Sequence, residues 1–402
     1  MPIFFIFFII ITIISILFSG LVIWNIIRLW SYRYFYQKIQ PNRKLIKSIF
    51  FGVHFLIPVA AIVSQLLVYD YYSRITSFIS TVSLWSLGAL GYLLLGSIIS
   101  WGIAWVLYMI RVITHKKHFT WNRFFIPFSL NTRTSIRVFI TFPIIVALGI
   151  IVYGTYATQT IKVVTYSIEN ESLNIPFPEN WVGQKIALVS DTHTGQVRKQ
   201  KILEKMVEKI NEQQPLITII AGDLIDGPKF PIHYLQPLTG LTSPLGNYFI
   251  PGNHEKYSRD SEIESLIGNY ITLLSDNFIT LDGVALVGID YHQSNPVKTF
   301  EVIQNTTELI PEETPIIGVM HDPKLIPFLI EKQPNLTLSG HTHGGQMWPG
   351  NILVNYLYKT FAYGLTRHNN EKTVHITTSG VGTALVPMRV GSVPEIVIIT
   401  IK

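Results

Sequence analysis

Five short segments of this 402-residue chain carry side chains that bind metal ions or transfer protons. Each follows directly after a short apolar run, and three contain glycine, which permits tight turns and close backbone approach. The segments are Asp191-Thr192-His193, Gly222-Asp223-Leu224-Ile225-Asp226-Gly227, Gly252-Asn253-His254-Glu255, His321 and Gly340-His341-Thr342-His343-Gly344-Gly345. Carboxylates, imidazoles and an amide oxygen suit divalent Zn, Mn or Fe, and the set has too many histidines for a Ca or Mg site.

The number of candidate ligands indicates two metal ions. One tetrahedral ion takes four ligands, and the segments offer seven. They are Asp191, His193, Asp223, Asn253, His321, His341 and His343. Two divalent ions carry more charge than Asp191 and Asp223 neutralise, and a hydroxide and a phosphate ester balance the remainder. Metal ions about 3.5–4 Å apart clamp the attacking and leaving oxygens in phosphate chemistry, so the residue types favour a phosphoesterase.

The apolar runs before these segments are predicted to be buried strands. They cover residues 185–190, 216–221, 247–251, 316–320 and 335–339, and the amphipathic stretches 199–212 and 261–270 between them predict helices. Ligands bind at the carboxyl ends of the strands in α/β sheets. We therefore expect one α/β domain over residues 158–402, with all five polar segments at one edge of its sheet.

The order of the motifs carries a family resemblance. DxH, GDxxD, GNHE, a lone His after a strand and GHxH resemble the signature of the calcineurin-like metallophosphoesterases, over roughly residues 185–402. GHTHGGQ at 340–346 and RVGSVPEI at 389–396 resemble a membrane-associated bacterial branch of that family. The resemblance implies an α/β domain with the αββα sandwich fold, and a binuclear centre.

The resemblance also implies a role for each ligand. One metal would be held by Asp191, His193, Asp223 and His343, and the other by Asp223, Asn253, His321 and His341. Asp223 would bridge both ions together with a hydroxide that attacks phosphorus. His254 would protonate the leaving oxygen or steady the transition state, and Asp226 or Glu255 would orient the ligands.

Simpler interpretations stay open for the other polar and aromatic residues near these motifs. Asp226 also fits a plain turn, and Glu255 fits an ordinary solvated charge. Trp348 fits either core packing or insertion among lipid headgroups. Arg367 and Arg389 fit either phosphate binding or a solvated surface.

Charge and hydropathy divide the chain near residue 157. Residues 1–157 hold 13 Lys and Arg and one acid, whereas residues 158–402 hold 18 Lys and Arg and 24 acids. Basic residues that flank apolar segments are orientation signals, so the net charge of +6 does not predict nucleic-acid binding. The lack of cysteine excludes disulfides and thiolate chemistry.

Four apolar stretches in the first part reach the length of about 20 residues that crosses a bilayer. They are 3–27, 49–69, 75–110 and 138–157, and a cleaved signal peptide is the alternative for the first. We expect residues 1–157 to form an all-α membrane domain of about four transmembrane helices. The basic loops after the first and third stretches predict a multi-pass cell-membrane protein whose domain at 158–402 lies outside the cytoplasm.

The sequence therefore predicts a membrane-anchored binuclear phosphoesterase for a phosphodiester, pyrophosphate or phosphomonoester. Tethering favours a lipid-linked substrate at the bilayer, and relatives in the resembling branch are linked with acylated sugar nucleotides. An external domain favours a phospholipid headgroup or an envelope polymer phosphate. A tethered enzyme for soluble nucleotides is the alternative. A non-catalytic sensor or transporter is a further alternative, although the spans carry almost no charge of the kind that ion pathways need.

Overall fold

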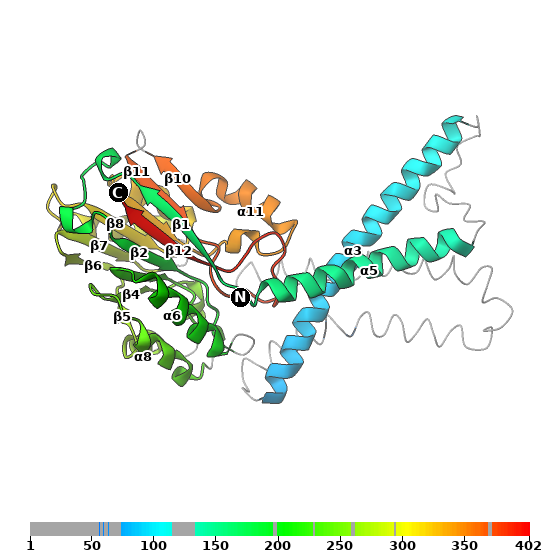
Figure 1. The fold of residues 1–402 in the computed structure, drawn as a ribbon, viewed down its shortest axis with the longest axis horizontal. Helices are drawn as coiled ribbons and strands as arrows, with labels where there is room; N and C mark the ends of the chain where they lie inside the picture. The colour runs from blue at the N-terminus through cyan, green and yellow to red at the C-terminus, as the bar shows by residue number, and fades with distance from the viewer. Residues whose placement is uncertain are drawn as a thin grey trace. The chain divides into compact units, whose positions relative to one another are not determined.

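The computed structural model describes residues 74–114 and 133–402 apart from 196–198, 228–229, 259–261, 293–294 and 369–371, together with Leu56, Val59 and Val63 (Figure 1). The chain divides into two compact units. Among the described residues, Phe78–Tyr153 belongs to the first unit with Leu56, Val59 and Val63, and residues 74–77 belong to the second with Gly154–Lys402. All five polar segments lie in the second unit.

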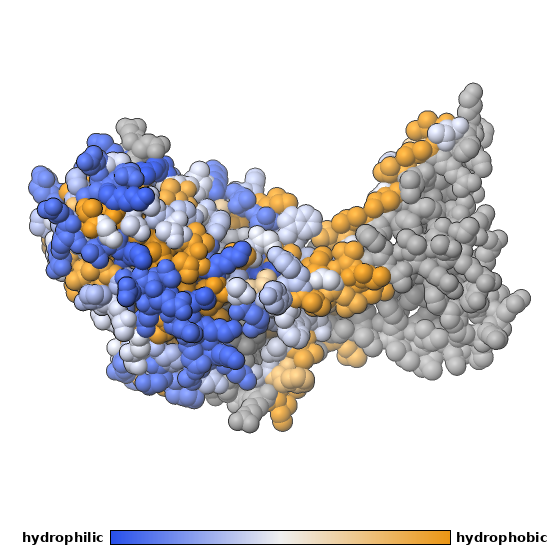
Figure 2. Space-filling view, viewed as in Figure 1, coloured by the Kyte–Doolittle hydropathy of each residue, from blue (hydrophilic) through white to orange (hydrophobic). Residues whose placement is uncertain are grey.

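Two long apolar helices lie mainly in the first unit. The helix α3 (Arg74–Thr114) is continuous over 41 residues, so the third apolar stretch neither breaks at its glycines nor bends back. Within the described chain, Ser77–Gly96 of α3 is the one segment long and apolar enough to cross a membrane. The helix α5 (Arg133–Ala157) has a shorter apolar part at Ile144–Ala157. Apolar side chains are exposed along both helices (Figure 2).

The described residues do not test the remaining predictions about the membrane domain. The stretches 3–27 and 49–69 and the basic loop between them fall outside the described residues, except for Leu56, Val59 and Val63. Most of the second basic loop, at 115–132, does so as well. The number of spans and the orientation of the chain therefore rest on the sequence.

The second unit contains two six-stranded sheets. The first has the order β1 (Lys162–Ile168), β12 (Glu395–Ile401), β2 (Lys185–Val189), β3 (Ile217–Ala221), β4 (Asn247–Ile250) and β5 (Thr272–Leu273). The second has the order β10 (Gly364–His368), β11 (Thr373–Thr377), β9 (Leu336–Ser339), β8 (Ile316–Met320), β7 (Val284–Ile289) and β6 (Asn277–Leu281). The strands that matter for the site, β2 to β4 and β8 to β9, are parallel within each sheet.

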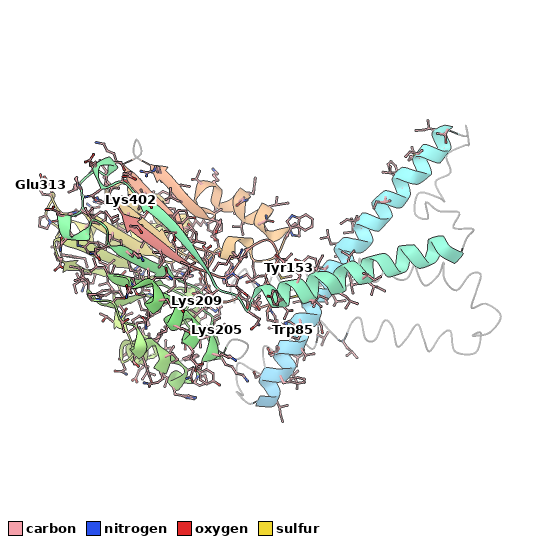
Figure 3. All side chains as sticks on the ribbon, in the orientation of Figure 1. Trp85, Tyr153, Lys205, Lys209, Glu313 and Lys402 are labelled. Atoms are coloured by element: carbon pink, nitrogen blue, oxygen red, sulfur yellow. The ribbon has the colours of Figure 1, made fainter. Side chains whose placement is uncertain are left out.

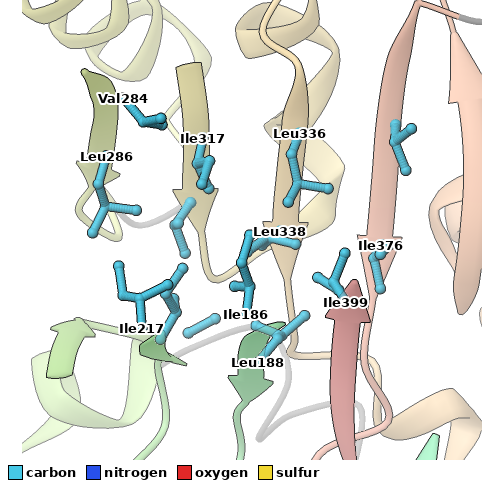
Figure 4. Close-up of a cluster of buried hydrophobic side chains, with 14 of the residues drawn as sticks. Ile186, Leu188, Ile217, Val284, Leu286, Ile317, Leu336, Leu338, Ile376 and Ile399 are labelled. Atoms are coloured by element: carbon cyan, nitrogen blue, oxygen red, sulfur yellow. The ribbon is translucent and has the colours of Figure 1, made fainter. Parts of the chain in front are cut away.

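The two sheets face one another across a shared apolar core. Strand residues from both sheets pack there, among them Ile186, Ile217, Leu286, Leu338 and Ile399 (Figure 4). Central strands such as β3 are buried along their whole length, because they are covered on both faces. Burial of this apolar area holds the two halves of the unit together.

Helices cover the outer face of each sheet. The helices of the second unit are α6 (Lys201–Gln213), α7 (Asn253–Tyr257), α8 (Ile263–Gly268), α9 (Pro296–Thr307), α10 (Ile326–Ile330) and α11 (Gly350–Tyr358). Short 3-10 turns lie at η2 (Asn170–Ser172), η3 (Glu179–Trp181), η4 (Ile232–Gly240), η5 (Pro323–Leu325), η6 (His343–Gly345) and η7 (Lys359–Phe361). One core cluster joins α6, α8 and η4 to the first sheet, and another joins α9 and α10 to the second. The predicted αββα sandwich is confirmed.

The helix α6 shows how sequence pattern sets this layering. Its buried side chains include Leu203, Met206 and Ile210, which recur at helical spacing and face the first sheet. Lys205 and Lys209 lie on its polar side (Figure 3). The helix ends where Gln214 adopts a left-handed conformation before a proline.

The five strands predicted from the sequence correspond to β2, β3, β4, β8 and β9, each within one residue of its predicted bounds. The expectation of one sheet edge is wrong. The first three strands belong to one sheet and the last two to the other. A continuous apolar run cannot reveal which sheet its strand joins, because the central strands of both sheets are covered on both faces.

The inter-sheet core gives a stability prediction. Leu286→Ala removes a side chain that is 1% exposed between the sheets, and we expect it to lower the free energy of unfolding by about 2–5 kcal/mol. The matched control Leu309→Ala removes a side chain that is 72% exposed and should change it by less than about 0.5 kcal/mol. Urea denaturation of the detergent-solubilised chain, followed by tryptophan fluorescence, measures both. Equal effects would contradict this account of the core.

Candidate metal centre

The polar segments meet where strands of the two sheets end. The first sheet contributes residues that follow β2, β3 and β4, namely Asp191, His193, Asp223, Asn253 and His254. The second sheet contributes residues that follow β8 and β9, namely His321, His341 and His343. Six of the seven predicted ligands are buried, and His341 is half-buried. The structure therefore brings all of the predicted ligands into one region at the junction of the sheets.

Asp191, His193 and His343 form one group of donor atoms. Nε2 of His193 lies 3.0 Å from Nε2 of His343 and 3.9 Å from Oδ1 of Asp191. Nε2 of His343 lies 3.4 Å from the same Oδ1. Ligands of a tetrahedral ion at about 2.1 Å are about 3.4 Å apart. The spacing of this group therefore fits a shared metal ion.

Asp223, His321 and His341 form a second group. Nε2 of His321 lies 3.1 Å from Oδ2 of Asp223 and 3.2 Å from Nδ1 of His341. The same oxygen of Asp223 lies 3.9 Å from Nε2 of His193, which belongs to the first group. Asp223 is thus positioned between the two groups, as a bridging carboxylate must be.

Several polar atoms in the centre are buried and need a proton or a cation beside them. Nδ1 of His321 donates to the carbonyl of Ala221 at 2.7 Å, and its Nε2 lies 3.1 Å from the carboxylate of Asp223. Burial lowers the pKa of His321, but the charge of Asp223 outweighs burial and raises this pKa to about 10. Oδ1 of Asp191 and Oδ1 of Asn253 are buried without any hydrogen bond. A divalent metal ion can replace the proton between His321 and Asp223 and can bind the two unpaired oxygens, and the donor set suits such ions.

The backbone holds these ligands in strained conformations. Five of the seven have positive φ values between 44° and 70°, namely Asp191, His193, Asp223, His341 and His343. A non-glycine residue in this region costs about 1–3 kcal/mol and persists only where surrounding contacts fix it. Such clustering is typical of functional sites.

Glu255 is one of the contacts that fix the loops. Its carboxylate accepts from the backbone N–H groups of Gly252 at 2.8 Å, Asp223 at 3.0 Å and Ile225 at 3.1 Å. It therefore ties the loop after β3 to the loop after β4. Burial and the nearby Asp223 raise the pKa of Glu255 to about 7. The interpretation of Glu255 as a solvated charge is wrong, because the side chain is buried.

Gly222 and Gly340 allow the two sheets to approach at the centre. A Cβ atom at Gly222 would overlap the ring of His321 from the opposite sheet. A Cβ atom at Gly340 would overlap the side chains of Ser190 and Asp191. Only glycine leaves room for the ligands of one sheet to reach those of the other.

His254 and Asp226 form a pair beside the ligand groups. Nδ1 of His254 lies 3.0 Å from Oδ1 of Asp226, and its Nε2 lies 3.9 Å from Oδ2 of Asp223. Burial lowers the pKa of His254, but the charge of Asp223 and the hydrogen bond with Asp226 outweigh it and raise the pKa to about 9. Near neutral pH the imidazole is therefore protonated, as a proton donor must be.

Comparisons with known proteins agree with this geometry. Residues 184–345 match the family profile described as calcineurin-like phosphoesterase. An uncharacterized metallophosphoesterase of Aquifex aeolicus is 30% identical over 260 residues, which cover 62% of this chain and 95% of that protein. This chain belongs to the calcineurin-like phosphoesterase family. The family resemblance of the motifs is confirmed.

Two further relatives of this calcineurin-like phosphoesterase are longer than the region that this chain matches. An uncharacterized metallophosphoesterase of Helicobacter pylori is 32% identical over 51% of this chain and 56% of its own length. A protein of Danio rerio named transmembrane protein with metallophosphoesterase domain is 32% identical over 64% of this chain and 62% of its own length. The chain thus spans somewhat more than half the length of these two relatives.

The sequence did not reveal where Arg389 lies in the phosphoesterase unit. It is fully buried, so neither a solvated surface nor phosphate binding describes it. Its guanidinium donates to the carbonyls of Ser379, Gly380, Gly382 and His343 at 2.7–3.3 Å. It thereby joins the loop after β11 to the loop that carries a predicted ligand.

Arg389 also affects the imidazole of His343 directly. One of its nitrogens lies 3.3 Å from Nδ1 of His343. Burial, the neighbouring His193 and the charge of Arg389 together hold the pKa of His343 well below its usual value. The ring therefore stays neutral, which is the form that binds metals. The only signal in the sequence was its place in the segment RVGSVPEI.

The pair of His254 and Asp226 predicts a change in pH dependence. Asp226→Asn removes a negative charge that favours the imidazolium, so the pKa of His254 should fall. If the imidazolium is the required form, hydrolysis declines as pH rises through this pKa. The alkaline limb of the pH–kcat profile should therefore move to lower pH. The control Asp282→Asn, at an exposed turn, should leave the limb in place, and an unmoved limb in Asp226→Asn would contradict the role of the pair.

Arg389 predicts a change in metal retention. Arg389→Lys replaces five donors by one ammonium group, which cannot join all the carbonyls. We expect the affinity for Mn or Zn to fall about 10–100-fold, the usual effect of losing a group that orients a ligand. Competition with a chelator measures the affinity, and circular dichroism monitors folding. Arg367→Lys, at a half-buried arginine on β10, is the matched control, and an equal loss in both variants would contradict the assignment.

Proposed function

We propose that this chain is a membrane-anchored, binuclear metal-dependent phosphoesterase. The observation that carries the proposal is the pair of ligand groups that meet at Asp223, with the protonated His254 beside them. Asp191, His193, Asp223 and His343 would hold one ion, and Asp223, Asn253, His321 and His341 the other. Mn, Zn and Fe all suit these ligands, and metal supply decides between them.

The residues of the centre divide the work of hydrolysis. Two bound divalent ions supply Lewis-acid stabilisation of phosphoryl oxygens and hydroxide at neutral pH. Asp223 holds the two ligand groups in register, and Glu255 fixes the loops from which Asp223 and Asn253 project. His254 donates its Nε2 proton to the leaving oxygen, and Asp226 fixes the orientation of the ring through Nδ1. The carboxylate of Asp226 also keeps this ring protonated before each turnover.

The substrate we propose is a phosphate ester linked to a lipid. The apolar helices α3 and α5 precede the catalytic unit in the chain, and a relative of similar sequence carries the name of a transmembrane protein. A tethered enzyme gains most when its substrate is confined to the same bilayer. We further propose a multi-pass anchor of about four spans, with the catalytic unit outside the cytoplasm, from the basic loops at 28–47 and 111–137.

The test uses the full chain in detergent, supplied with Mn, Zn or Fe and with bis-p-nitrophenyl phosphate as substrate. We expect hydrolysis and a pair of metal ions per chain by elemental analysis. Asp223→Asn should lose metal. Its rate should fall by more than about 100-fold, which is the loss expected for a residue that only orients a ligand. His254→Gln should keep the metal and lose about 10²–10⁴-fold in kcat.

The two variants separate metal binding from proton transfer. A chain that binds no metal, or an Asp223→Asn variant as active as the wild type, would exclude the proposal. Lipid-linked phosphodiesters in mixed micelles, compared with free nucleotides under the same conditions, then distinguish the proposed substrate from a soluble one. A preference for free nucleotides would overturn the lipid assignment and leave the hydrolase assignment intact.

A further inference from the structure

The helix α11 follows the metal loop and contributes nothing to the core. None of its nine residues is buried, whereas α6 buries five of its thirteen. Its exposed side chains are nevertheless apolar. Together with the preceding Trp348 they form what we call the α11 surface, composed of Trp348, Ile352, Leu353, Tyr356 and Leu357, each 43–78% exposed. Soluble domains rarely expose a contiguous apolar group of this kind without a partner.

Helical geometry places these side chains on one side of α11. The four helical residues occur as two adjacent pairs four positions apart, which span less than half of the helix circumference. The opposite side carries Tyr358, whose ring centroid lies 6.1 Å from that of His341. One side of the helix thus contacts a predicted metal ligand, while the other faces outward.

The α11 surface lies next to the point where the apolar helix α5 enters the catalytic unit. The carbonyl of Gly154, in the last turn of α5, accepts from the N–H of Arg389 at 2.9 Å, and Gly154 packs against Val390. The carbonyl of Val390 in turn accepts from the N–H of Trp348 at 2.7 Å. Val390 therefore lies between the last turn of α5 and Trp348, the first residue of the α11 surface.

Charge in this region suits an anionic bilayer. The chain has no Asp or Glu between Lys332 and Asn370, a range that includes the metal loop and α11. Lys359 follows α11 directly and is exposed. An apolar face that includes tryptophan and tyrosine, with a lysine beside it, is typical of helices that lie in a membrane interface.

We infer that the α11 surface docks into the lipid bilayer and sets the metal centre at the level of the headgroups. Because the last turn of α5 ends beside Val390, Trp348 lies close to the point where the chain would leave a membrane that holds α5. The phosphate of a membrane lipid then reaches the centre without leaving the bilayer. This inference rests on the proposed membrane attachment and does not depend on hydrolysis.

The test exploits the absence of cysteine from the chain. Leu353→Cys and Tyr356→Cys, each labelled with a nitroxide, are reconstituted as full chains in vesicles of equal parts phosphatidylcholine and phosphatidylglycerol. Val297→Cys on α9 is the control, because Val297 is also apolar and 67% exposed. Power-saturation spectroscopy gives the depth parameter, which is the logarithm of oxygen accessibility over nickel-chelate accessibility.

We expect a positive depth parameter at positions 353 and 356 and a negative one at 297. Negative values at all three positions would mean that the surface faces water, and would overturn the inference. Low accessibility to both oxygen and nickel at 353 and 356 would mean that protein covers the surface, and would overturn it as well. The measurement requires no turnover, so an inactive chain and an undocked α11 give distinguishable results.

Discussion

The gathering of buried imidazoles and carboxylates at the junction of the sheets is the constraint on which the rest of the unit depends. Nε2 of His321 faces the carboxylate of Asp223 at 3.1 Å, and Nε2 of His193 faces Nε2 of His343 at 3.0 Å. In a dry interior each pair needs a proton or a cation between its atoms. A metal ion that binds there should therefore contribute directly to the stability of the unit.

That demand explains features that would otherwise only destabilise the fold. Positive φ angles occur at five of the predicted ligands, and the strain persists because neighbouring contacts fix each loop. The buried carboxylate of Glu255 fixes the loops after β3 and β4. The buried guanidinium of Arg389 fixes the loop after β9. Two buried charged side chains, which an apolar core would not hold, thus support the loops of the centre.

The division of the ligands between two sheets links the centre to the core. Neither sheet carries a complete ligand group, because Asp191 and His193 meet His343, and Asp223 meets His321 and His341. The groups exist only while the shared core holds the sheets together. The helix α11 stands outside this framework, since it touches the centre through Tyr358 and leaves its apolar side uncovered.

Local sequence determined the strands, the helix α6 and the ligands, because each depends on short-range pattern: apolar runs, helical spacing, and a polar motif at each strand end. Tertiary structure decided how the strands divide between two sheets and which charges are buried. For Glu255 and Arg389 the sequence left a solvated surface charge open beside a role in the site, since a single chain segment does not show the backbone groups that distant loops bring to them. The exposure of α11 was likewise hidden, because its composition is that of a core helix. Burial is a property of what packs against a segment, and only the folded chain supplies the neighbours.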